Sequence, residues 1–308
     1  MSTPTPRWST SYLAALAVAA VPGLDAVATR HPRTVTEHLE VTGVLDSAGR
    51  AWVVRAPRDD ATGAALALES ALLAALERED LPFDLARTAG WVELDDGGRA
   101  VVQTALPGRP LVLAALHAGP GVAADLGAAL AALHRVPLDT VSDLVPVYDA
   151  EACRTRLLAE LDALAATGRV PAVLLRRWEH ALEDVALWRF STTFVHGDLA
   201  SDRVLVEGEE VVALEDFAQA HVGDPAVDLA WLVAAAPEDA LESVLEAYAL
   251  GAPEGDAHAL DRAQLLSELA LGRWLQHGLR VSEPQVVAEA EEMLADLAEA
   301  VTAVPDED

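Results

Sequence analysis

Two aspartates in the second half of the chain have the residue type and the spacing of a shared chemical site. Asp198 follows the apolar run TTFV, and Asp216 comes at the end of VVALED. The segment RVLVEGEEVVAL between them is typical of a hairpin, which would bring strand ends together. One carboxylate in such a place can accept a proton from a nucleophile while the other holds a divalent cation. The spacing alone indicates a two-carboxylate site and leaves the reaction open.

The composition describes a folded globular chain with a large excess of acidic residues. With 308 residues, 52% hydrophobic content and a net charge of -29, the chain can bury a sizeable core and repels nucleic acid and anionic membranes. A cationic small molecule is the partner that this charge attracts. All 21 basic residues are arginine, so a P-loop is excluded and any phosphate-binding side chain is a guanidinium.

Cysteine usage and the N-terminal segment predict a cytoplasmic protein. Cys153 is the single cysteine, which excludes internal disulfides and fits a reducing compartment, and we expect an inert packing residue. The run YLAALAVAAV has the length of a signal-peptide core, but one basic residue precedes it and Pro22-Gly23 ends it as a helix stop would. We therefore expect a first helix packed on the domain. Elsewhere no run is long and apolar enough to span a bilayer.

Turn signals and hydrophobic periods divide the chain into two kinds of structure. Two hairpins are predicted around DSAGR and DDGG, with a helix over residues 61–78 between them. After residues 106–108 the pattern becomes helical, apart from the short strands TTFV, RVLVEG and EVVALEDF. The sequence thus predicts an α+β fold with a small β-rich N-terminal lobe over residues 1–105. A larger, mostly helical C-terminal lobe would cover residues 106–308.

The segments VHGDLASDRVLV and LEDFAQAHVGDPAVDLAW resemble the catalytic segment of the aminoglycoside and macrolide phosphotransferases. That family has HGDL, three variable residues and then Asn or His, followed by a strand ending in Asp-Phe or Asp-Trp and a GDP-x-x-D helix start. The N-terminal lobe has VRAPR where macrolide phosphotransferases have sequences like RIPR, so the macrolide 2'-phosphotransferases are the closest match. The resemblance implies a protein-kinase-like bilobal fold.

The resemblance implies roles for the acidic residues of these segments. Asp198 would be the general base that takes the proton of the acceptor hydroxyl, and Asp216 would hold Mg²⁺ on the phosphates of ATP or GTP. Three residues would support the loop structurally: His196 as a prop, Asp224 as the cap of the next helix, and Asp228 as a hydrogen-bonded tie between that helix and the catalytic loop.

In the N-terminal lobe, the resemblance implies a nucleotide-binding set. Arg55 occupies the place of the phosphate-pairing lysine, and Glu69 is its expected ion-pair partner. The alternative is an ordinary exposed strand arginine and a helix glutamate. Thr104, Ala105 and Leu106 match the hinge whose backbone would hydrogen-bond a purine, and their side chains do not distinguish ATP from GTP.

Arg203 departs from the family pattern, because it stands where the second metal ligand belongs. A cation there would repel Mg²⁺ by several kcal/mol at an effective dielectric near 20. Three outcomes are open: the side chain turns to solvent, contacts phosphate in place of a metal, or leaves the site inactive.

Two function classes follow from the resemblance. The first is a nucleoside-triphosphate-dependent O-phosphotransferase acting on a hydroxyl of a small cationic molecule, such as an aminoglycoside or macrolide. The alternative is a degenerate pseudokinase that binds without transferring phosphate. A hydrolase using Asp198 and His196 is disfavoured because no G-x-S-x-G elbow is present. His134, His180 and His277 lack metal-ligand spacing and are expected to be surface or packing residues, and the helices after Gly251 would line the acceptor pocket.

Overall fold

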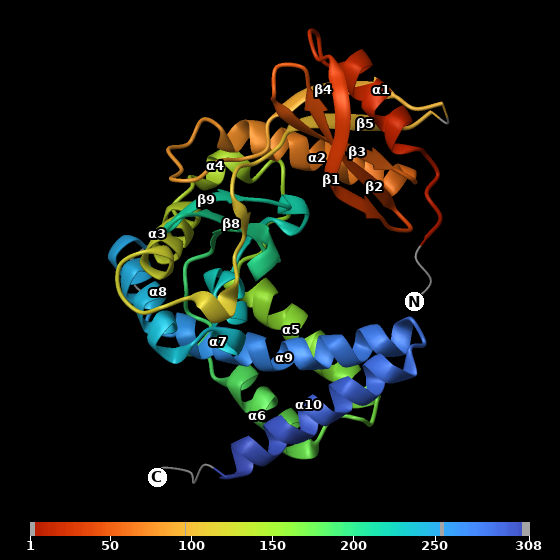
Figure 1. Ribbon diagram of the computed structural model, residues 1–308. Coiled ribbons are helices and arrows are strands. Elements are labelled where there is room, and N and C mark those ends of the chain that lie inside the picture. Colours follow the sequence, from red (N-terminus) through yellow and green to blue (C-terminus); the bar gives the residue numbers. More distant parts are fainter. Residues whose placement is uncertain (1–3, 96, 253–255, 304–308) are drawn as a thin grey trace. The chain divides into compact units, whose positions relative to one another are not determined.

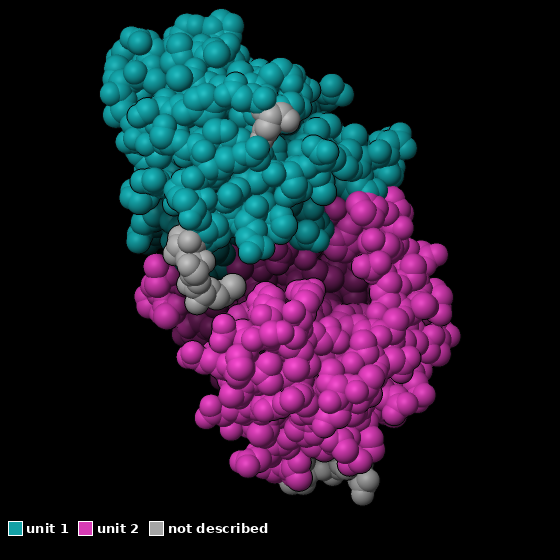
Figure 2. All heavy atoms as spheres, turned by 90° about the vertical axis from the view of Figure 1, so that its right-hand side faces the viewer, with its two compact units in different colours: residues 1–111, 139–145, 201–219 teal, residues 112–138, 146–200, 220–308 magenta. Residues whose placement is uncertain are grey.

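In the computed structural model, the chain folds into two units, and each unit is built from several separate stretches of the sequence. The structure describes residues 4–95, 97–252 and 256–303. Unit 1 comprises residues 1–111, 139–145 and 201–219, and unit 2 comprises residues 112–138, 146–200 and 220–308. Figure 2 colours unit 1 teal and unit 2 magenta. The predicted lobe division at residues 105 and 106 stays a prediction, because the units are not continuous in sequence.

An antiparallel five-stranded sheet is the framework of unit 1 (Figure 1). Its strands have the order β1-β2-β3-β5-β4, with bounds β1 Ala26–Val35, β2 Leu39–Asp46, β3 Ala51–Pro57, β4 Thr88–Glu93 and β5 Arg99–Thr104. The two predicted hairpins are present as β2–β3 and β4–β5, although Asp96 of the second turn lies outside the described residues. Successive residues of a strand face opposite sides, so Trp52 and Val54 of β3 face one side and Val53 and Arg55 the other.

The first helix, α1 (Thr10–Ala20), covers one face of this sheet. The Ser9 side chain caps it by accepting a hydrogen bond from the Tyr12 amide. Leu13 and Ala17 are buried in a core with Trp52 and other residues of the sheet. The segment that has the length of a signal-peptide core is therefore a packed helix, as predicted.

Helix α2 (Asp60–Leu76) packs on β3 and β5 and covers the opposite side of the sheet. Asp59 caps its N-terminus by accepting from the Thr62 amide. The helix turns Leu72, Leu73 and Leu76 inward, and burial of such leucines stabilises the lobe by roughly 2 kcal/mol each. On the same helix Glu69 is also buried, so this helix carries one charged side chain into the interior.

A three-stranded sheet completes unit 1 with segments that come later in the chain. Its order is β6-β8-β9, and the elements here are β6 Arg109–Pro110, α4 Leu138–Val141, η2 Ser201–Arg203, β8 Val204–Glu207, β9 Glu210–Leu214 and η3 Phe217–Gln219. The predicted hairpin is present, with Val204 opposite Leu214. Asp216 lies two residues after the end of β9, so this hairpin sets the position of its carboxylate in unit 1.

Unit 2 is mostly helical. Its elements are η1 Leu113–Ala115, α3 Val122–His134, α5 Ala150–Ala166, α6 Ala172–Glu183, β7 Thr193–Val195, β10 His221–Gly223, η4 Pro225–Asp228, α7 Ala230–Ala235, α8 Glu238–Gly251, α9 Ala259–Arg280 and α10 Pro284–Ala303. Helices α3 and α8 approach so closely that a Cβ on Gly127 would lie 2.2 Å from the Val244 carbonyl oxygen. Burial raises the pKa of the half-buried Cys153 to about 11, which makes its thiol a poor nucleophile.

The predicted α+β class is confirmed, and three strands, β1, β6 and β10, depart from the sequence prediction. Strand β1 was not predicted, and its residues are largely exposed along the edge of the sheet. Pro32 interrupts the strand pattern there, and proline is tolerated in a sheet at such an edge. Within the described ranges, no helix combines the length and apolarity needed to cross a membrane.

Candidate functional site

A cavity of about 280 Å³ in unit 1 is lined by most of the residues that were predicted to bind the nucleotide. Arg55, Glu69, Thr104, Leu106 and Asp216 all line it. The other lining is largely apolar, from Pro32, Leu39, Val41, Val53, Leu73, Leu214 and Phe217. Strands β1, β2, β3 and β5, helix α2 and the segment after β9 thus provide one pocket with apolar walls and a few charged groups, which is the usual composition of a ligand site.

The predicted partners Arg55 and Glu69 form an ion pair inside this pocket. The Arg55 Nη1 lies 2.7 Å from the Glu69 Oε2, and the two side chains are 17% and 3% exposed. This burial excludes the alternative of a solvent-exposed strand arginine and helix glutamate. Burial raises the pKa of Glu69, and the charge and hydrogen bond of Arg55 oppose that rise. The guanidinium is thus held on the pocket side of the sheet by a buried carboxylate.

Arg203 does not turn away from the predicted metal ligand. Its Nε lies 3.3 Å from the Asp216 Oδ2, and the side chains are 23% and 42% exposed. Asp216 has a backbone φ of 69°, a conformation that costs a residue with a Cβ about 1 kcal/mol or more. The carboxylate therefore belongs to a strained residue just after β9, and the Arg203 cation of the same unit contacts one of its oxygens.

Only part of the predicted hinge lines the pocket, and two of its backbone amides are already used in hydrogen bonds within unit 1. Thr104 and Leu106 line the cavity, while Ala105 is not among the described residues that do. The Thr104 amide donates to the Arg87 carbonyl at 2.9 Å, and the Ala105 amide donates to the Ala51 carbonyl at 3.1 Å. A base could use these two amides only by breaking hydrogen bonds within the chain.

The second predicted carboxylate, Asp198, belongs to unit 2 and lies in the loop after β7. Asp228 fixes this loop, because its Oδ2 accepts from the His196 amide at 2.7 Å and its Oδ1 from the Gly197 amide at 2.8 Å. Gly197 has a φ of 83°, which only glycine adopts without strain. The His196 ring is buried, and its Nδ1 accepts from the Asp198 amide at 3.4 Å. The loop backbone is therefore held on both sides of Gly197.

His134 contributes to this network, so the expectation of a surface or packing residue is too simple. Its Nε2 lies 3.1 Å from the Asp228 Oδ2, and its Nδ1 lies 2.8 Å from the Tyr248 hydroxyl. All of these groups are buried. His134 is the last residue of α3, before a proline-containing break. A histidine on the inward face of a helix needs a polar partner, and this was the sequence signal for the buried network.

Asp228→Asn is expected to lower the free energy of unfolding by about 2 kcal/mol at neutral pH, because an amide cannot accept from both loop donors and the His134 ring. Burial alone would raise the pKa of Asp228, but the hydrogen bond and charge of His134 hold the pKa below its ordinary value. That stability is present above the ordinary aspartate pKa of about 4 and is lost as the pH falls through the folded-state pKa.

Urea unfolding at a series of pH values measures this effect. The difference in unfolding free energy between the wild type and Asp228→Asn should narrow as the pH falls below about 4. Asp162→Asn, on the exposed face of α5, is the control and should show no such change. A difference that stays constant down to the acid limit would contradict the lowered pKa.

Asp224 is a second buried carboxylate of unit 2, and it has a partner that the sequence did not reveal. Its side chain caps η4 by accepting from the Ala226 amide. The Arg262 guanidinium donates to both Asp224 oxygens at 2.8 and 2.9 Å and also pairs with Asp256. Arg262 is fully buried and lies over the Phe190 ring at 4.1 Å. A bidentate pair of this kind fixes α9 against the segment that follows β10.

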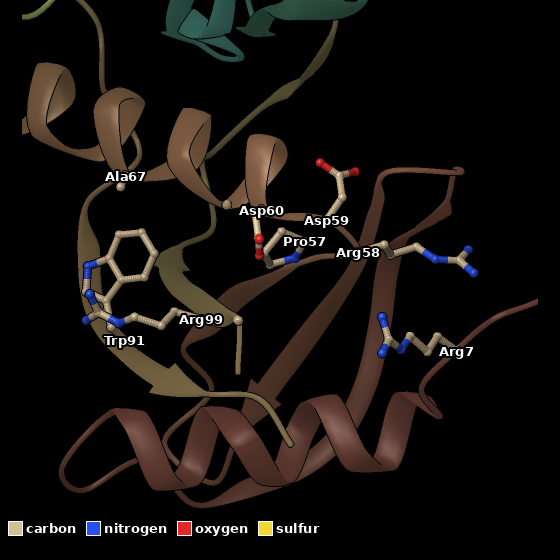
Figure 3. Close-up of a pocket in the computed structure, with 10 residues that line it drawn as sticks. Arg7, Pro57, Arg58, Asp59, Asp60, Ala67, Trp91 and Arg99 are labelled. Atoms are coloured by element: carbon tan, nitrogen blue, oxygen red, sulfur yellow. The ribbon is translucent and has the colours of Figure 1, made fainter. Parts of the chain in front are cut away.

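A second hollow of unit 1, about 380 Å³ in volume, lies at the N-terminal end of α2 and is lined by several arginines (Figure 3). Figure 3 shows Trp91 beside Arg99, whose guanidinium carbon lies 4.9 Å from the ring centroid. Arg58 lies 3.8 Å from Glu40. These cations already have partners in the chain, and the predicted nucleotide residues line the other cavity.

Solved structures share this arrangement of elements. The macrolide 2'-phosphotransferase MphH from Brachybacterium faecium has a TM-score of 0.78 and 25% identity, over 97% of this chain and 100% of that one. A macrolide 2'-phosphotransferase type I has a TM-score of 0.73 and 25% identity, over 96% and 99%. The GDP and kanamycin complex of APH(2")-IIIa has a TM-score of 0.76 and 18% identity, over 95% and 99%. The fold is therefore protein-kinase-like, as predicted.

The family follows from the sequence itself. The model of the phosphotransferase enzyme family matches residues 41–266, which is most of the chain. The chain belongs to that family, and the predicted resemblance is confirmed. No curated protein sequence matches it significantly.

Proposed function

We propose that the chain transfers the γ-phosphoryl group of a nucleoside triphosphate to a hydroxyl group of a small molecule of the aminoglycoside or macrolide kind. Family and fold support a small-molecule phosphotransferase. The observation that carries the proposal is the buried Arg55–Glu69 pair in the same pocket as Asp216. Phosphoryl transfer depends mainly on positioning and charge neutralisation, and this pocket offers a fixed cation and a carboxylate for both.

The proposed reaction assigns the acceptor proton to Asp198. The acceptor hydroxyl oxygen forms a bond to the γ-phosphorus, its proton passes to the Asp198 carboxylate, and the bond to the bridging oxygen breaks as the nucleoside diphosphate leaves. Support for this role comes from the position of Asp198 in HGDL and from the hydrogen bonds that fix the His196 and Gly197 backbone beside it.

The chemistry of the donor set fits magnesium, with Asp216 as the residue that would hold it. Mg²⁺ is commonly bound by one or two carboxylates together with substrate phosphates and water, so the partly exposed Asp216 carboxylate in the pocket is a sufficient protein ligand. The ion would neutralise phosphate charge when it is bound with the nucleotide. Arg55 would bind phosphate oxygens through its guanidinium, which can donate to two of them at once.

The acceptor is proposed to be cationic, because a net charge of -29 attracts cations. Neighbouring structures include aminoglycoside complexes with kanamycin and gentamicin. Helix α9 is proposed to contribute to acceptor binding, and its Trp274 is 38% exposed and stacked on His277. We also propose a cytoplasmic location. A single cysteine fits a reducing compartment, and so does a nucleoside triphosphate substrate.

Product analysis tests the proposal. The protein, Mg²⁺ and either ATP or GTP are incubated with a panel of aminoglycosides and macrolides, and mass spectrometry measures the gain of one phosphoryl group. A phosphorylated acceptor supports the proposal, and nucleotide binding without any product supports the alternative. That alternative is a pseudokinase, and it is favoured by the contact between Arg203 and Asp216.

Arg203→Asn is expected to lower the Mg²⁺ concentration needed for half-maximal nucleotide binding by roughly fivefold, the factor that corresponds to about 1 kcal/mol for a partly exposed ion pair. The change removes a cation from the Asp216 carboxylate and adds an oxygen ligand. Nucleotide titrations at several Mg²⁺ concentrations measure this effect, and transfer should rise or appear. A gain would identify the wild type as a weakened or inactive kinase.

Two other results have definite meanings. If Arg203 contacts phosphate in place of a metal, the variant should need more Mg²⁺ and should turn over more slowly at low Mg²⁺. If neither the Mg²⁺ dependence nor the rate changes, the Arg203–Asp216 pair has no part in nucleotide binding. Arg176→Asn, the same substitution on the exposed face of α6, serves as the control and should change neither.

A further inference from the structure

Gln103 is a polar residue in the wall of the unit 1 cavity with an unsatisfied amide. It belongs to β5, it is 2% exposed, and it lines the same cavity as Arg55 and Asp216. Its amide Nε2 is buried and has no hydrogen-bond partner in the part of the chain that the structure describes. In sequence it interrupts the apolar run VVQTAL, so a polar group occupies a position where an aliphatic side chain would be ordinary.

The register of the sheet places Gln103 on the pocket side. It lies opposite Val53 of β3, and Arg55 lies two residues further along that strand. Val53 and Arg55 both line the cavity. The neighbouring residues of β5, Val102 and Ala100, belong instead to the core under α1. The alternation of the strand therefore directs Gln103 to the same side as the proposed phosphate-binding cation.

An unsatisfied buried donor is unusual, because nearly all buried polar groups in native proteins are hydrogen-bonded. Leaving one unpaired costs about 1 to 3 kcal/mol, and an aliphatic residue of similar size would avoid this cost. The neighbouring Thr104 hydroxyl accepts from the Arg87 amide at 3.0 Å, and it is not a partner of the Gln103 amide nitrogen. A bound ligand is thus the partner that the Gln103 amide lacks.

We propose that Gln103 determines base specificity by donating a hydrogen bond to the 6-oxo group of guanine, so that GTP is the preferred phosphoryl donor. The inference rests on the proposed nucleotide role of this cavity. A planar purine fits the apolar walls, and the unpaired end of the amide is a donor, which requires an acceptor. Guanine has an acceptor oxygen at position 6, whereas adenine has a donor amino group there. Two donors facing each other in a dry pocket would leave both unsatisfied.

Binding of four triphosphates to the wild type tests the inference at the edge of the base formed by positions 1 and 6. GTP and inosine triphosphate have the 6-oxo group, ATP has a 6-amino group, and 2-aminopurine riboside triphosphate has neither. Calorimetric titration with Mg²⁺ should show the two 6-oxo nucleotides binding about tenfold more tightly than the other two, as expected for one buried hydrogen bond and its unpaired alternative. Preference for ATP would overturn the donor assignment and indicate that the amide oxygen faces the base.

Gln103→Leu separates this role from a structural one. The variant should bind GTP and inosine triphosphate about tenfold more weakly, while its affinity for ATP changes by less than about threefold, since only the hydrogen bond to position 6 is lost. Gln103→Glu, an acceptor without a donor, should shift the preference toward ATP. Gln285→Leu, the same change on the exposed surface of α10, should change neither.

The outcomes distinguish failure of this inference from failure of the proposed function. If the wild type binds no nucleoside triphosphate, the proposed function fails. If it binds all four and Gln103→Leu weakens them equally or not at all, Gln103 does not determine specificity and this inference is overturned. Thermal unfolding shows whether Gln103→Leu is folded, and Gln103→Met is the second variant if it is not.

Discussion

Replacing Asp198 with Asn should reduce phosphoryl transfer by about a thousandfold, while nucleotide affinity stays within about threefold of the wild type. General bases contribute factors of about 10² to 10⁴, and the proposed base acts on the acceptor hydroxyl, not on the purine or its phosphates. The Asp198 amide donates to the His196 ring, and replacing the side-chain carboxylate with an amide leaves that backbone contact in place. Product formation and calorimetric nucleotide titration measure the two effects separately.

The result depends on a control with the same chemical change. Asp162→Asn, on the exposed face of α5 in the same unit, should transfer phosphate at the wild-type rate. If Asp198→Asn keeps near-normal turnover, the loop is not the catalytic loop, and the assignment carried by HGDL is wrong. If both activity and nucleotide affinity disappear together, the variant has lost its fold, which thermal unfolding reveals.

The second large loss of phosphoryl transfer is expected for Asp216→Asn, because this substitution should weaken binding of the Mg²⁺–nucleotide complex. Loss of the carboxylate should lower transfer by about 10² to 10³, the range found when one preorganised charge-stabilising group is removed. Nucleotide affinity should fall when Mg²⁺ is present and stay the same when it is absent, because the residue is proposed to act only through the ion. Titration curves with excess Mg²⁺ and with a chelator provide this comparison.

Equal titration curves for the wild type and Asp216→Asn in excess Mg²⁺ would remove Asp216 from the metal site. A stability measurement is needed beside them, because Asp216 has a φ of 69° and asparagine tolerates that conformation better than most residues. The substitution is therefore not expected to strain the chain. A fall in activity with normal Tm would be a local effect of the missing charge.

The elements predicted best from sequence are those whose patterns are local. The helix α1, the hairpins β2–β3 and β8–β9, and the helix α2 follow from apolar spacing, turn residues and stop signals that lie within a few positions of each other. Strand β1 was missed because Pro32 disrupts the pattern of a strand, and its register also shifts between Arg30 and Arg33. Bulges and prolines at an edge remove the alternation by which strands are found.

The candidate site shows the same limit for contacts distant in sequence. A family pattern assigns Asp198, Asp216 and Asp228 by position. It does not identify His134, which is 94 residues from Asp228 in the chain and shares its carboxylate, or Arg262, which is 38 residues from Asp224. The need for such partners could be anticipated, since buried carboxylates require donors. Which residues supply them depends on helix packing that no local pattern encodes.

Arg203 and Gln103 illustrate what only the coordinates resolve. The sequence identifies the departure at Arg203 but leaves three outcomes open, and the structure shows the side chain on Asp216. Gln103 stands in an apolar run, which signals an unusual position, yet the missing hydrogen-bond partner is visible only in the folded chain. Both are polar residues in places where packing or pattern favours something else, and such exceptions concentrate at functional sites.

The Arg55–Glu69 pair also changes which reagents can react with the pocket. Nucleotide analogues with acylating or aldehyde groups attach to proteins through a neutral amine, and a lysine beside the phosphates normally provides it. The sequence has no lysine, and a guanidinium is a poorer nucleophile than an amine. Such amine-directed probes therefore leave this pocket unmodified, and a covalent inhibitor aimed at it needs a different warhead, for instance a dicarbonyl that condenses with guanidinium groups.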